Sequence, residues 1–378
     1  SGIEASGIGI TVANINGGSI GGRRNIIING DMRIAQRGTS RSSTTQGASH
    51  ATVDRFQLQW NNFSVAAVES QGDVGTSDTP YTLGFRKYHR ITLASAGTAS
   101  GSTYVEYLYK VEAQDMATSG WNYTSPSSFI TLSFWFRCST NQTFYGVFRT
   151  ADGTGQGYAF SFTATGNNEW TKVIKTIPGN SNITINNDNG VGLSLYIFPA
   201  LGTSYTDDSK SLNSWGTFAN SSYCPDMSTT WLTAGASTFD LTGVQLEVGS
   251  QATSFEHRSH GDELELCKRY YEQFNSEGLT EAPFGVGYFE SDTQLRAVVP
   301  LHEKRADVSF SSTAASTFAS MNTNNMPAGS SISLYKTGKK AAIIMLVLGS
   351  SVTSGDGRAG ILCAQSSTEA TLKFDSEL

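Results

Sequence analysis

Apolar and polar residues alternate with a period of two along most of the chain between residues 25 and 249. In Ile130–Arg137, for example, every second side chain is a large apolar one. The same alternation recurs at Val105–Val111, Tyr158–Phe162 and Val191–Ile197. Successive side chains of a strand point to opposite faces, so these runs predict strands with one face in a core. Turn-forming clusters such as Ala151–Gly155 and Asn186–Gly190 separate them, and an antiparallel β-sandwich is expected.

Residues 259–274 carry the helical period that the preceding part lacks. Ser259 and Asp262 form a capping signature at its start. Apolar residues at helical spacing form one stripe, namely Leu264, Cys267, Tyr271 and Phe274. Leu266 and Tyr270 form a second stripe, so this helix is expected to pack against two surfaces.

A second set of short apolar runs follows between Glu281 and Leu378, the strongest being Ala341–Leu348. Six short strands suit a small second sandwich. The pattern therefore predicts an all-β protein with two antiparallel β-sandwich domains joined by one α-helix. The expected parts are an N-terminal arm or connector (1–24), a sandwich (25–256), which the resemblance described below implies to be jelly-roll-like, a linker helix (257–274) and a small sandwich (275–378).

Composition agrees with this division and excludes several functions. A chain of 378 residues exceeds what one core usually serves. Its net charge of −6 gives no attraction for a phosphate backbone, so nucleic-acid binding is not expected. The longest apolar run has eight residues, too few to insert across a bilayer as a helix. The cysteines are widely spaced, which predicts free thiols at Cys138, Cys224, Cys267 and Cys363.

Two sequence blocks resemble bacteriophage tail-fibre and related virion proteins. The first is Asn25–Thr39 with Thr52–Phe56. The second comprises Leu241–Gly249, Ala252–Ser259 and Glu263–Tyr271. The segment 25–249 also resembles carbohydrate-binding jelly-roll modules. Many of those hold a structural calcium with acidic residues at positions where this chain has Arg33 and Thr242-Gly243, so no calcium is carried over.

The resemblance implies a non-enzymatic virion protein, a tail fibre or receptor-binding protein that attaches to a bacterial surface glycan. It further implies a homotrimer, contact with other virion proteins through the N-terminal region, and a place on the phage particle after assembly in the bacterial cytoplasm. Two alternatives stay open. One is a capsid-attached head fibre or decoration protein, and the other is a non-catalytic carbohydrate-binding part of a polysaccharide-degrading tail spike.

The sequence contains no recognised catalytic motif. There is no His-Glu-x-x-His pair, no Gly-x-Ser-x-Gly elbow and no P-loop. His257 and His260 lie three residues apart, a spacing that we interpret as a solvated connector. We therefore expect no catalytic residue, no metal site and no cofactor. Arg37, Asp54 and Arg55 of the first block are expected to form a buried structural network.

Aromatic residues outside the alternating runs are the candidates for glycan contact. Sugars present apolar C–H faces, against which a flat ring packs well. The candidate glycan-binding residues are Trp121, Tyr123, Trp215, Tyr223 and Trp231. The alternative is that each ring only anchors its own loop.

Overall fold

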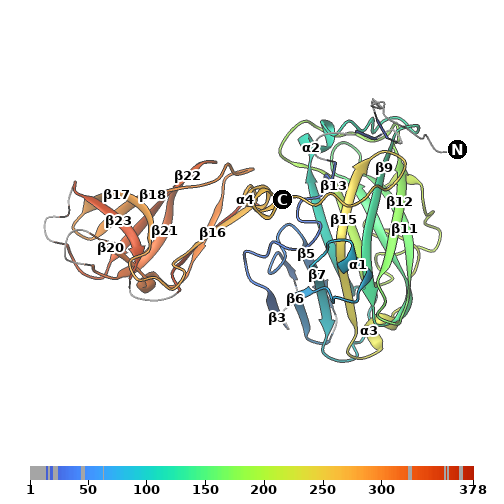
Figure 1. Ribbon diagram of the computed structural model, residues 1–378, viewed down its shortest axis with the longest axis horizontal. Coiled ribbons are helices and arrows are strands. Elements are labelled where there is room, and N and C mark those ends of the chain that lie inside the picture. The colour runs from blue at the N-terminus through green and yellow to red at the C-terminus, as the bar shows by residue number, and fades with distance from the viewer. Residues whose placement is uncertain are drawn as a thin grey trace, which may run out of the picture. The chain divides into compact units, whose positions relative to one another are not determined.

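In a computed structural model the chain forms two compact units, residues 1–258 and 259–378, and nearly all of its regular structure is β-strand. The structure describes residues 14–15, 18–19, 24–43, 47–62, 64–321, 326–352, 355, 357–365 and 369–378. Among the described residues, each unit contains two large or medium sheets, and the first unit also has the two-stranded β1–β2 pair (Figure 1). The expected arm thus lies largely outside the described residues, apart from the paired strands β1 (Asn14–Ile15) and β2 (Gly18–Ser19).

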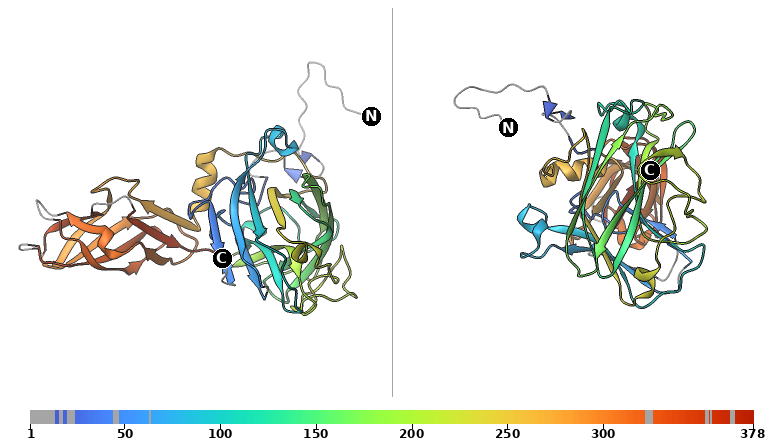
Figure 2. Two further views of the ribbon diagram at one scale, coloured as in Figure 1. Left: turned by 90° about the horizontal axis from the view of Figure 1, so that it is seen from below. Right: turned by 90° about the vertical axis from the view of Figure 1, so that its right-hand side faces the viewer.

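The first unit is a sandwich of two antiparallel sheets, and Figure 2 shows their two layers. The order of the seven-stranded sheet is β14 (Trp215–Thr217), β11 (Gln156–Thr165), β10 (Asn141–Thr150), β13 (Val191–Leu201), β8 (Tyr104–Glu112), β5 (Gln57–Asn61) and β4 (Gly47–Ser49). The order of the six-stranded sheet is β12 (Thr171–Pro178), β9 (Phe129–Cys138), β15 (Thr238–Val248), β7 (Lys87–Leu93), β6 (Ala67–Asp73) and β3 (Ser40–Ser43). The short helices α1 (Thr79–Thr82), α2 (Ala113–Ala117) and α3 (Thr230–Thr233) lie in the connections.

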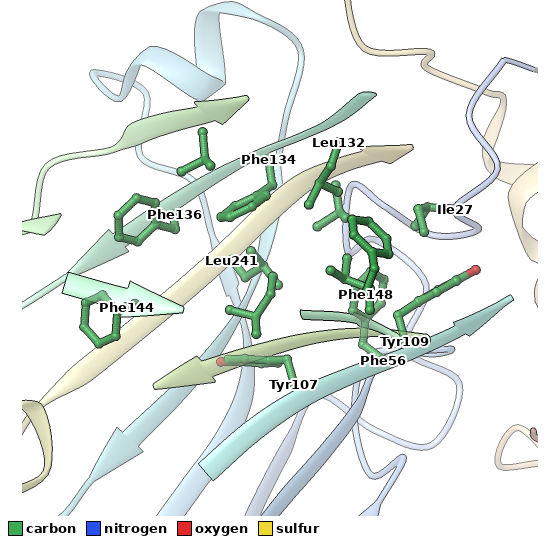
Figure 3. Close-up of a cluster of buried hydrophobic side chains, with 14 of the residues drawn as sticks. Ile27, Phe56, Tyr107, Tyr109, Leu132, Phe134, Phe136, Phe144, Phe148 and Leu241 are labelled. Atoms are coloured by element: carbon green, nitrogen blue, oxygen red, sulfur yellow. The ribbon is translucent and has the colours of Figure 1, made fainter. Parts of the chain in front are cut away.

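Aromatic rings from both sheets fill the space between the layers (Figure 3). Phe136 of β9 lies 4.9 Å from Phe162 of β11, centroid to centroid, in an edge-on arrangement. Phe144 of β10 meets Phe239 of β15 at 5.2 Å. Burying each such ring is worth about 1.5–3 kcal/mol. The core between the two sheets thus confirms the prediction made from the period-two pattern of the sequence.

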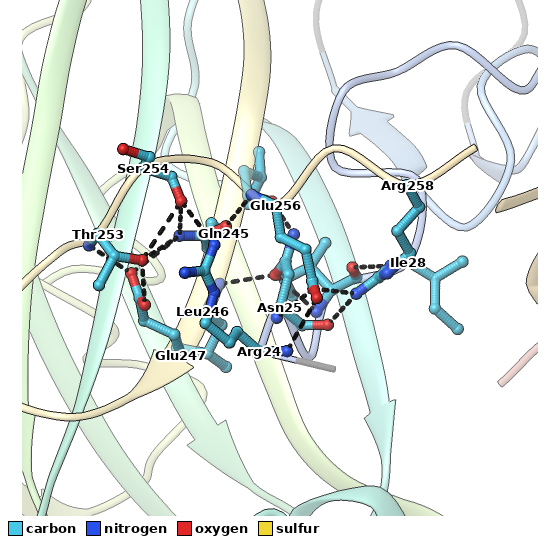
Figure 4. A network of polar contacts seen from close by, with 12 residues as sticks. Arg24, Asn25, Ile28, Gln245, Leu246, Glu247, Thr253, Ser254, Glu256 and Arg258 are labelled. Carbon is cyan, nitrogen blue, oxygen red and sulfur yellow. Dashed lines mark hydrogen bonds and ion pairs between the residues drawn. The ribbon is translucent and has the colours of Figure 1, made fainter. Parts of the chain in front are cut away.

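Asn25 joins the first sequence block to the last strand of the sandwich (Figure 4). Its side-chain nitrogen donates to the carbonyl of Val244 at 3.1 Å, and its side-chain oxygen accepts from the backbone N–H of Leu246 at 3.0 Å and of Ile27 at 3.0 Å. Nearby, a Cβ at Gly30 would lie 2.0 Å from the Val244 carbonyl oxygen, so only glycine fits. Two segments about 200 residues apart in sequence are thereby held in one register.

Arg258 adds a cation to the same junction. Its guanidinium donates to the carbonyls of Asn25 and Ile27 and pairs with Glu256 at 3.0 Å. The Glu256 carboxylate accepts the backbone N–H of Asn25 at 2.8 Å and of Arg24 at 3.2 Å. The Arg258 guanidinium thus pairs with two carbonyls and one carboxylate of this junction.

The polar residues of the first block form the buried network that the sequence predicted. Asn29 donates to the carbonyls of Ile34 (2.8 Å) and Asp54 (2.9 Å). Arg37 lies 3.9 Å from the Asp54 carboxylate. Arg55 donates to the Lys110 carbonyl at 2.8 Å. These contacts give the motif a structural role within the fold.

The second unit begins with helix α4 (His260–Lys268), where the Ser259 hydroxyl accepts the backbone N–H of Asp262 as predicted. A three-stranded sheet has the order β16 (Tyr271–Asn275), β24 (Thr371–Asp375) and β19 (Ser309–Ser312). A six-stranded sheet has the order β20 (Phe318–Met321), β23 (Ala359–Ala364), β17 (Pro283–Ser291), β18 (Gln294–Pro300), β22 (Ala341–Leu348) and β21 (Gly329–Thr337). The turn η1 (Ala315–Thr317) precedes β20. One apolar core lies within this unit.

The prediction of a helix extending to residue 274 is wrong. The helix ends at Lys268, and Tyr271–Asn275 pairs with β24 as a strand. Tyr270 lies beyond the helix and is 1% exposed, so Leu266 and Tyr270 do not form a second helical stripe. The helix and this strand belong to the second unit rather than to a separate linker. The four cysteines are free and buried, as expected.

Replacing Asn25 by alanine should destabilise the first unit by about 2–4 kcal/mol, because buried backbone groups of Val244 and Leu246 lose their partner. All six tryptophans lie before residue 258, so tryptophan fluorescence during urea unfolding monitors this unit alone. The exposed Asn220→Ala serves as the control and should leave the midpoint unchanged. Equal midpoints for Asn25→Ala and the parent would contradict the proposed role of this junction.

Candidate functional site

The outer face of the seven-stranded sheet, meaning the side turned away from the sandwich core, carries the candidate site. In β8 the side chains of Val105, Tyr107 and Tyr109 enter the core, so Tyr104 and Glu106 lie on the opposite face. The strand register adds β5 residues to this face. Gln59 lies directly opposite Glu106, and Asn61 lies opposite Tyr104. Carboxyl, amide and phenol groups are thus brought together by pairing of two neighbouring strands.

Glu106 is the distinctive group of this face. It is 8% exposed, and within the described part of the chain its carboxyl forms no hydrogen bond or ion pair. Burial raises its pKa to about 8, and the charge of Lys110 opposes that rise. The carboxyl is therefore mainly protonated at neutral pH, so that it offers one hydrogen-bond donor and one acceptor.

Other buried carboxyls in the same unit are paired. Asp240 accepts from Arg90 at 2.6 Å and from Arg137 at 2.7 Å on the outer face of the six-stranded sheet. Glu69 accepts the Thr52 hydroxyl at 2.7 Å and lies 3.0 Å from His89 Nε2. Paired carboxyls of this kind stabilise the fold. Glu106 differs from them because its carboxyl has no hydrogen-bond or ion-pair partner among the described residues.

An amide pair lies beside this carboxyl. The Gln59 side-chain nitrogen donates to the Gln57 side-chain oxygen at 2.6 Å. This bond orients both amides and leaves the Gln57 nitrogen and the Gln59 oxygen for further bonding. A fixed amide pair next to a neutral carboxyl can donate to and accept from neighbouring hydroxyl groups.

Tyrosine rings border the polar groups. The Tyr104 and Tyr205 rings meet edge to face at 5.7 Å, and both are partly exposed. Tyr196 and Tyr223 pack at 5.6 Å within a second apolar cluster on this face. Burial raises the pKa of Tyr223, and the nearby Tyr196 and Glu106 add to that rise. The segment 202–229, between β13 and α3, supplies Tyr205 and Tyr223 and thus lies over this sheet.

Two of the five aromatics predicted for glycan contact are fully incorporated into the core. Trp121 is 3% exposed and donates to the Ser128 carbonyl at 3.3 Å. Trp231 is 0% exposed and donates to the Thr238 carbonyl at 3.0 Å. A ring without accessible surface cannot pack on a sugar, so for these two residues the alternative of a loop anchor holds.

The remaining three are partly buried. Tyr123 packs on the core and donates to the Ile185 carbonyl at 3.4 Å. Trp215 of β14 donates to the Pro178 carbonyl at 2.6 Å. Of the five, Tyr223 is the one whose pKa is raised in part by the charge of Glu106. The structure therefore does not bring the five residues together, and it leaves Tyr223 beside the candidate site.

Sequence reasoning missed Glu106, Gln59 and Tyr104, because they lie inside runs predicted to be strands. The run from 104 to 112 gave a signal in retrospect, since Glu106 stands between Tyr104 and Leu108 on the side of the strand that faces away from the core. Whether Glu106 is a candidate binding group depends on the residues that surround its side chain, and these come from strands distant in sequence. A strand pattern alone does not identify them.

No cluster of three or more histidine, cysteine or acidic side chains with metal-binding proximity occurs among the residues that the structure describes. Within the same residues, none of the helices has the length and apolarity needed to cross a membrane.

No protein-family model matches the sequence, and no curated protein matches it either. Among solved structures, the enzymatically active domain of tailspike protein 4 from bacteriophage CBA120 superposes with a TM-score of 0.30 at 8% identity, covering 59% of this chain and 21% of that one. A CBM4 structure gives 0.27 at 12% identity, covering 58% and 97%. TmCBM61 in complex with beta-1,4-galactotriose gives 0.26 at 10% identity, covering 59% and 98%. This chain spans about a fifth of the tailspike chain, and all three likenesses are low.

The Glu106 carboxyl predicts a pH dependence of stability. Its pKa is raised from 4.5 to about 8 by folding, so the folded chain binds this proton more tightly than the unfolded chain. The stabilising effect is therefore complete below pH 4.5 and is lost as the pH rises through about 8.

Glu106→Gln should consequently gain about 1–4 kcal/mol relative to the parent above pH 8, and little below pH 4.5. Urea unfolding followed by tryptophan fluorescence at both pH values measures this difference. The exposed Glu169→Gln is the matched control, and its effect should be the same at both. A pH-independent effect of Glu106→Gln would contradict the burial of an unpaired carboxyl here.

Proposed function

We propose that this chain is a non-enzymatic phage adhesin, a tail-fibre or receptor-binding protein that attaches to a bacterial surface glycan through the outer face of the seven-stranded sheet. The observation that carries the proposal is the unpaired Glu106 carboxyl beside the Gln57–Gln59 amide pair and the Tyr104 ring. The virion context rests on the two sequence blocks that resemble phage fibre proteins.

The chemistry of this face suits a sugar better than other ligands. Saccharides combine hydroxyl edges, which need both donors and acceptors, with apolar C–H faces. A protonated carboxyl and two amides supply both kinds of group, and the partly exposed Tyr104 and Tyr205 rings supply flat apolar surface. A hydroxyl that replaces water at Glu106 bonds a group which has already lost most of its hydration, so the desolvation cost of binding is low.

A binding role is favoured over glycoside hydrolysis. Hydrolysis of a glycosidic bond generally needs two carboxyl groups placed on either side of it. The charged group that acts on the Glu106 pKa is Lys110, a cation. A lone protonated carboxyl with a nearby cation can hold a hydroxyl but lacks the second carboxylate that would act as nucleophile or base.

Because the chain resembles phage fibre proteins, we propose that three copies of it form a parallel homotrimer. The N-terminal region is proposed to contact other virion proteins, and the particle surface is the proposed location. Leu266 and Tyr270 supply no second helical face for such a contact, since Tyr270 lies beyond the helix and is buried in a single chain. The trimer therefore rests on the sequence resemblance.

The binding face is tested with a panel of purified bacterial surface polysaccharides. Tyr104→Ala and Gln59→Ala should each lower affinity about tenfold or more, because each removes a ring contact or a fixed amide worth about 1.4 kcal/mol or more. Tyr81→Ala removes another partly exposed tyrosine of the same unit, one in α1 outside this face, and should bind like the parent. Unchanged affinity of both face variants, or a parent that binds no polysaccharide of the panel, would reject the proposal.

The purified parent protein should release no reducing ends from any polysaccharide that it binds, because Glu106 has no catalytic partner. A reducing-sugar assay measures this directly, with heat-treated protein as the blank. Release that disappears in Glu106→Gln would overturn the assignment and make Glu106 an acid catalyst.

A further inference from the structure

Arg149 of β10 is a cation on the outer face of the seven-stranded sheet that lacks a carboxylate partner. Phe148 enters the core, so Arg149 lies on the opposite face. Its side chain is partly exposed, and among the described residues it forms no ion pair and its Nε has no hydrogen-bond partner. Arg90 and Arg137, by contrast, share the Asp240 carboxylate. An arginine held on the binding face without a carboxylate is a candidate for contact with an anion.

The Phe218 ring positions this guanidinium. The central carbon of the Arg149 guanidinium lies 4.3 Å from the centroid of the Phe218 ring. Phe218 in turn meets the Tyr223 ring edge to face at 4.8 Å, and its backbone N–H donates to the Gly155 carbonyl at 2.9 Å. Stacking on a ring uses the flat face of a guanidinium and leaves its N–H edge for hydrogen bonds. The edge of Arg149 can therefore donate two parallel hydrogen bonds to one carboxylate.

Strand pairing places a second cation in the same row. Arg149 lies opposite Ser194 of β13, and Ser194 lies opposite Lys110 of β8. Neighbouring strands are about 4.8 Å apart, so the backbones at Arg149 and Lys110 are roughly 10 Å apart. Both side chains are long and partly exposed, and the residue between them is small. The row thus presents two positive charges along one line of the face.

The carboxylates nearest to this row in sequence have other partners. Glu112, the next outward residue of β8, is 0% exposed and accepts from the Gln114 side chain at 2.6 Å. Asp152, just after β10, accepts the backbone and side-chain nitrogens of Asn186, both at 2.8 Å. Glu106 is mainly protonated at neutral pH, so it adds no negative charge that would repel an anion. The charge of Arg149 therefore remains available to a ligand.

Acidic residues of the segment 202–229 act on another part of the face. Burial raises the pKa of Tyr145, and Cys224, Asp208 and Asp226 add to that rise. Tyr145 and Arg149 lie on the same side of β10 but four residues apart, which is roughly 14 Å at about 3.4 Å per residue. An anionic group of a ligand is thus directed to the Arg149 end of the strand.

The basic row and Glu106 belong to one binding surface. Burial raises the pKa of Tyr223, Tyr196 and Glu106 add to the rise, and the charge of Arg149 opposes it. Tyr223 is thus influenced by both groups. Along β8, Glu106 and Lys110 are four residues apart, again roughly 14 Å. This span is longer than one sugar ring, so a ligand that reaches both ends is an oligosaccharide.

We propose that the glycan bound by this face is acidic, and that a uronic-acid carboxylate of the glycan pairs with the Arg149 guanidinium. The inference rests on the proposed function, because it names the class of glycan that the same face takes. The two oxygens of a carboxylate match the planar fork of an arginine. Lys110 acts as a point charge that attracts the same group. Neutral Glu106 and the Gln57–Gln59 amides bond hydroxyl groups of the neighbouring sugar.

The test uses the panel of bacterial surface polysaccharides in two forms, native and with uronic carboxylates chemically reduced to primary alcohols. The parent full-length chain should bind the native form about tenfold or more tightly than the reduced form. Arg149→Gln should bind both forms alike, with the affinity that the parent has for the reduced form. Arg149→Lys keeps the charge without the fork, so it should retain a smaller preference for the native form.

Two further variants serve as controls. Lys172→Gln removes an exposed cation from β12 in the other sheet of this unit, and it should keep the full preference. Tyr104→Ala should weaken binding of both forms by the same factor, because its ring contacts no carboxylate of the ligand. Thermal unfolding establishes that each variant is folded at the assay temperature.

The outcomes separate this inference from the function on which it rests. If the parent binds native and reduced forms equally while Tyr104→Ala weakens binding, the proposed function stands and the acidic ligand is rejected. A folded Arg149→Gln that keeps the full preference would reject the role of Arg149. If Arg149→Gln weakens binding of both forms by the same factor, the guanidinium bonds a group other than a uronic carboxylate, and the inference is overturned. A parent that binds no polysaccharide of the panel rejects both.

Discussion

The hydrogen bonds of Asn25 are the constraint on which the first unit depends. The opening segment and the last strand of this sandwich are far apart in sequence, so side-chain contacts must join them. Here one buried carboxamide bonds the Val244 carbonyl and the Leu246 N–H, and the Arg258 guanidinium bonds two carbonyls of the opening segment. The polar groups on the outer face of the seven-stranded sheet depend on the register of β8 and β5, because a slip by one residue would turn them into the core.

Buried charged groups that are paired have a structural role, whereas a buried ionisable group without a partner is a candidate for function. In the second unit, Lys304 is 0% exposed and is held by Glu272 at 3.0 Å and by the Lys268 carbonyl. In the first unit Asp240 is similarly paired, with Arg90 and Arg137. An unpaired buried carboxyl costs stability, and a fold that retains one at Glu106 gives up free energy for some other property. This contrast, rather than the carboxyl by itself, supports a ligand at that face.

The sequence predicted those features that arise from local pattern. Alternation located the strands around Ile130 and Val105, and the Ser259 cap located the start of the helix. It failed at Tyr271, where apolar spacing fits both a helix and a strand, and pairing with a strand about 100 residues later decided between them. It also failed for Trp231, because a residue outside an alternating run can still be buried by distant strands. Position relative to the core is a property of tertiary structure.

The two units differ in how the outward face of a large sheet is used. On the first unit, the segment 202–229 covers part of the face with tyrosines and leaves polar groups such as Gln59 at its border. On the second unit, the outward valines of β17 and β18 are uncovered by any described segment of that unit. A polar border with few rings suits a hydrated ligand that is bound and released. Because the same strand geometry underlies both faces, they differ in side-chain chemistry alone.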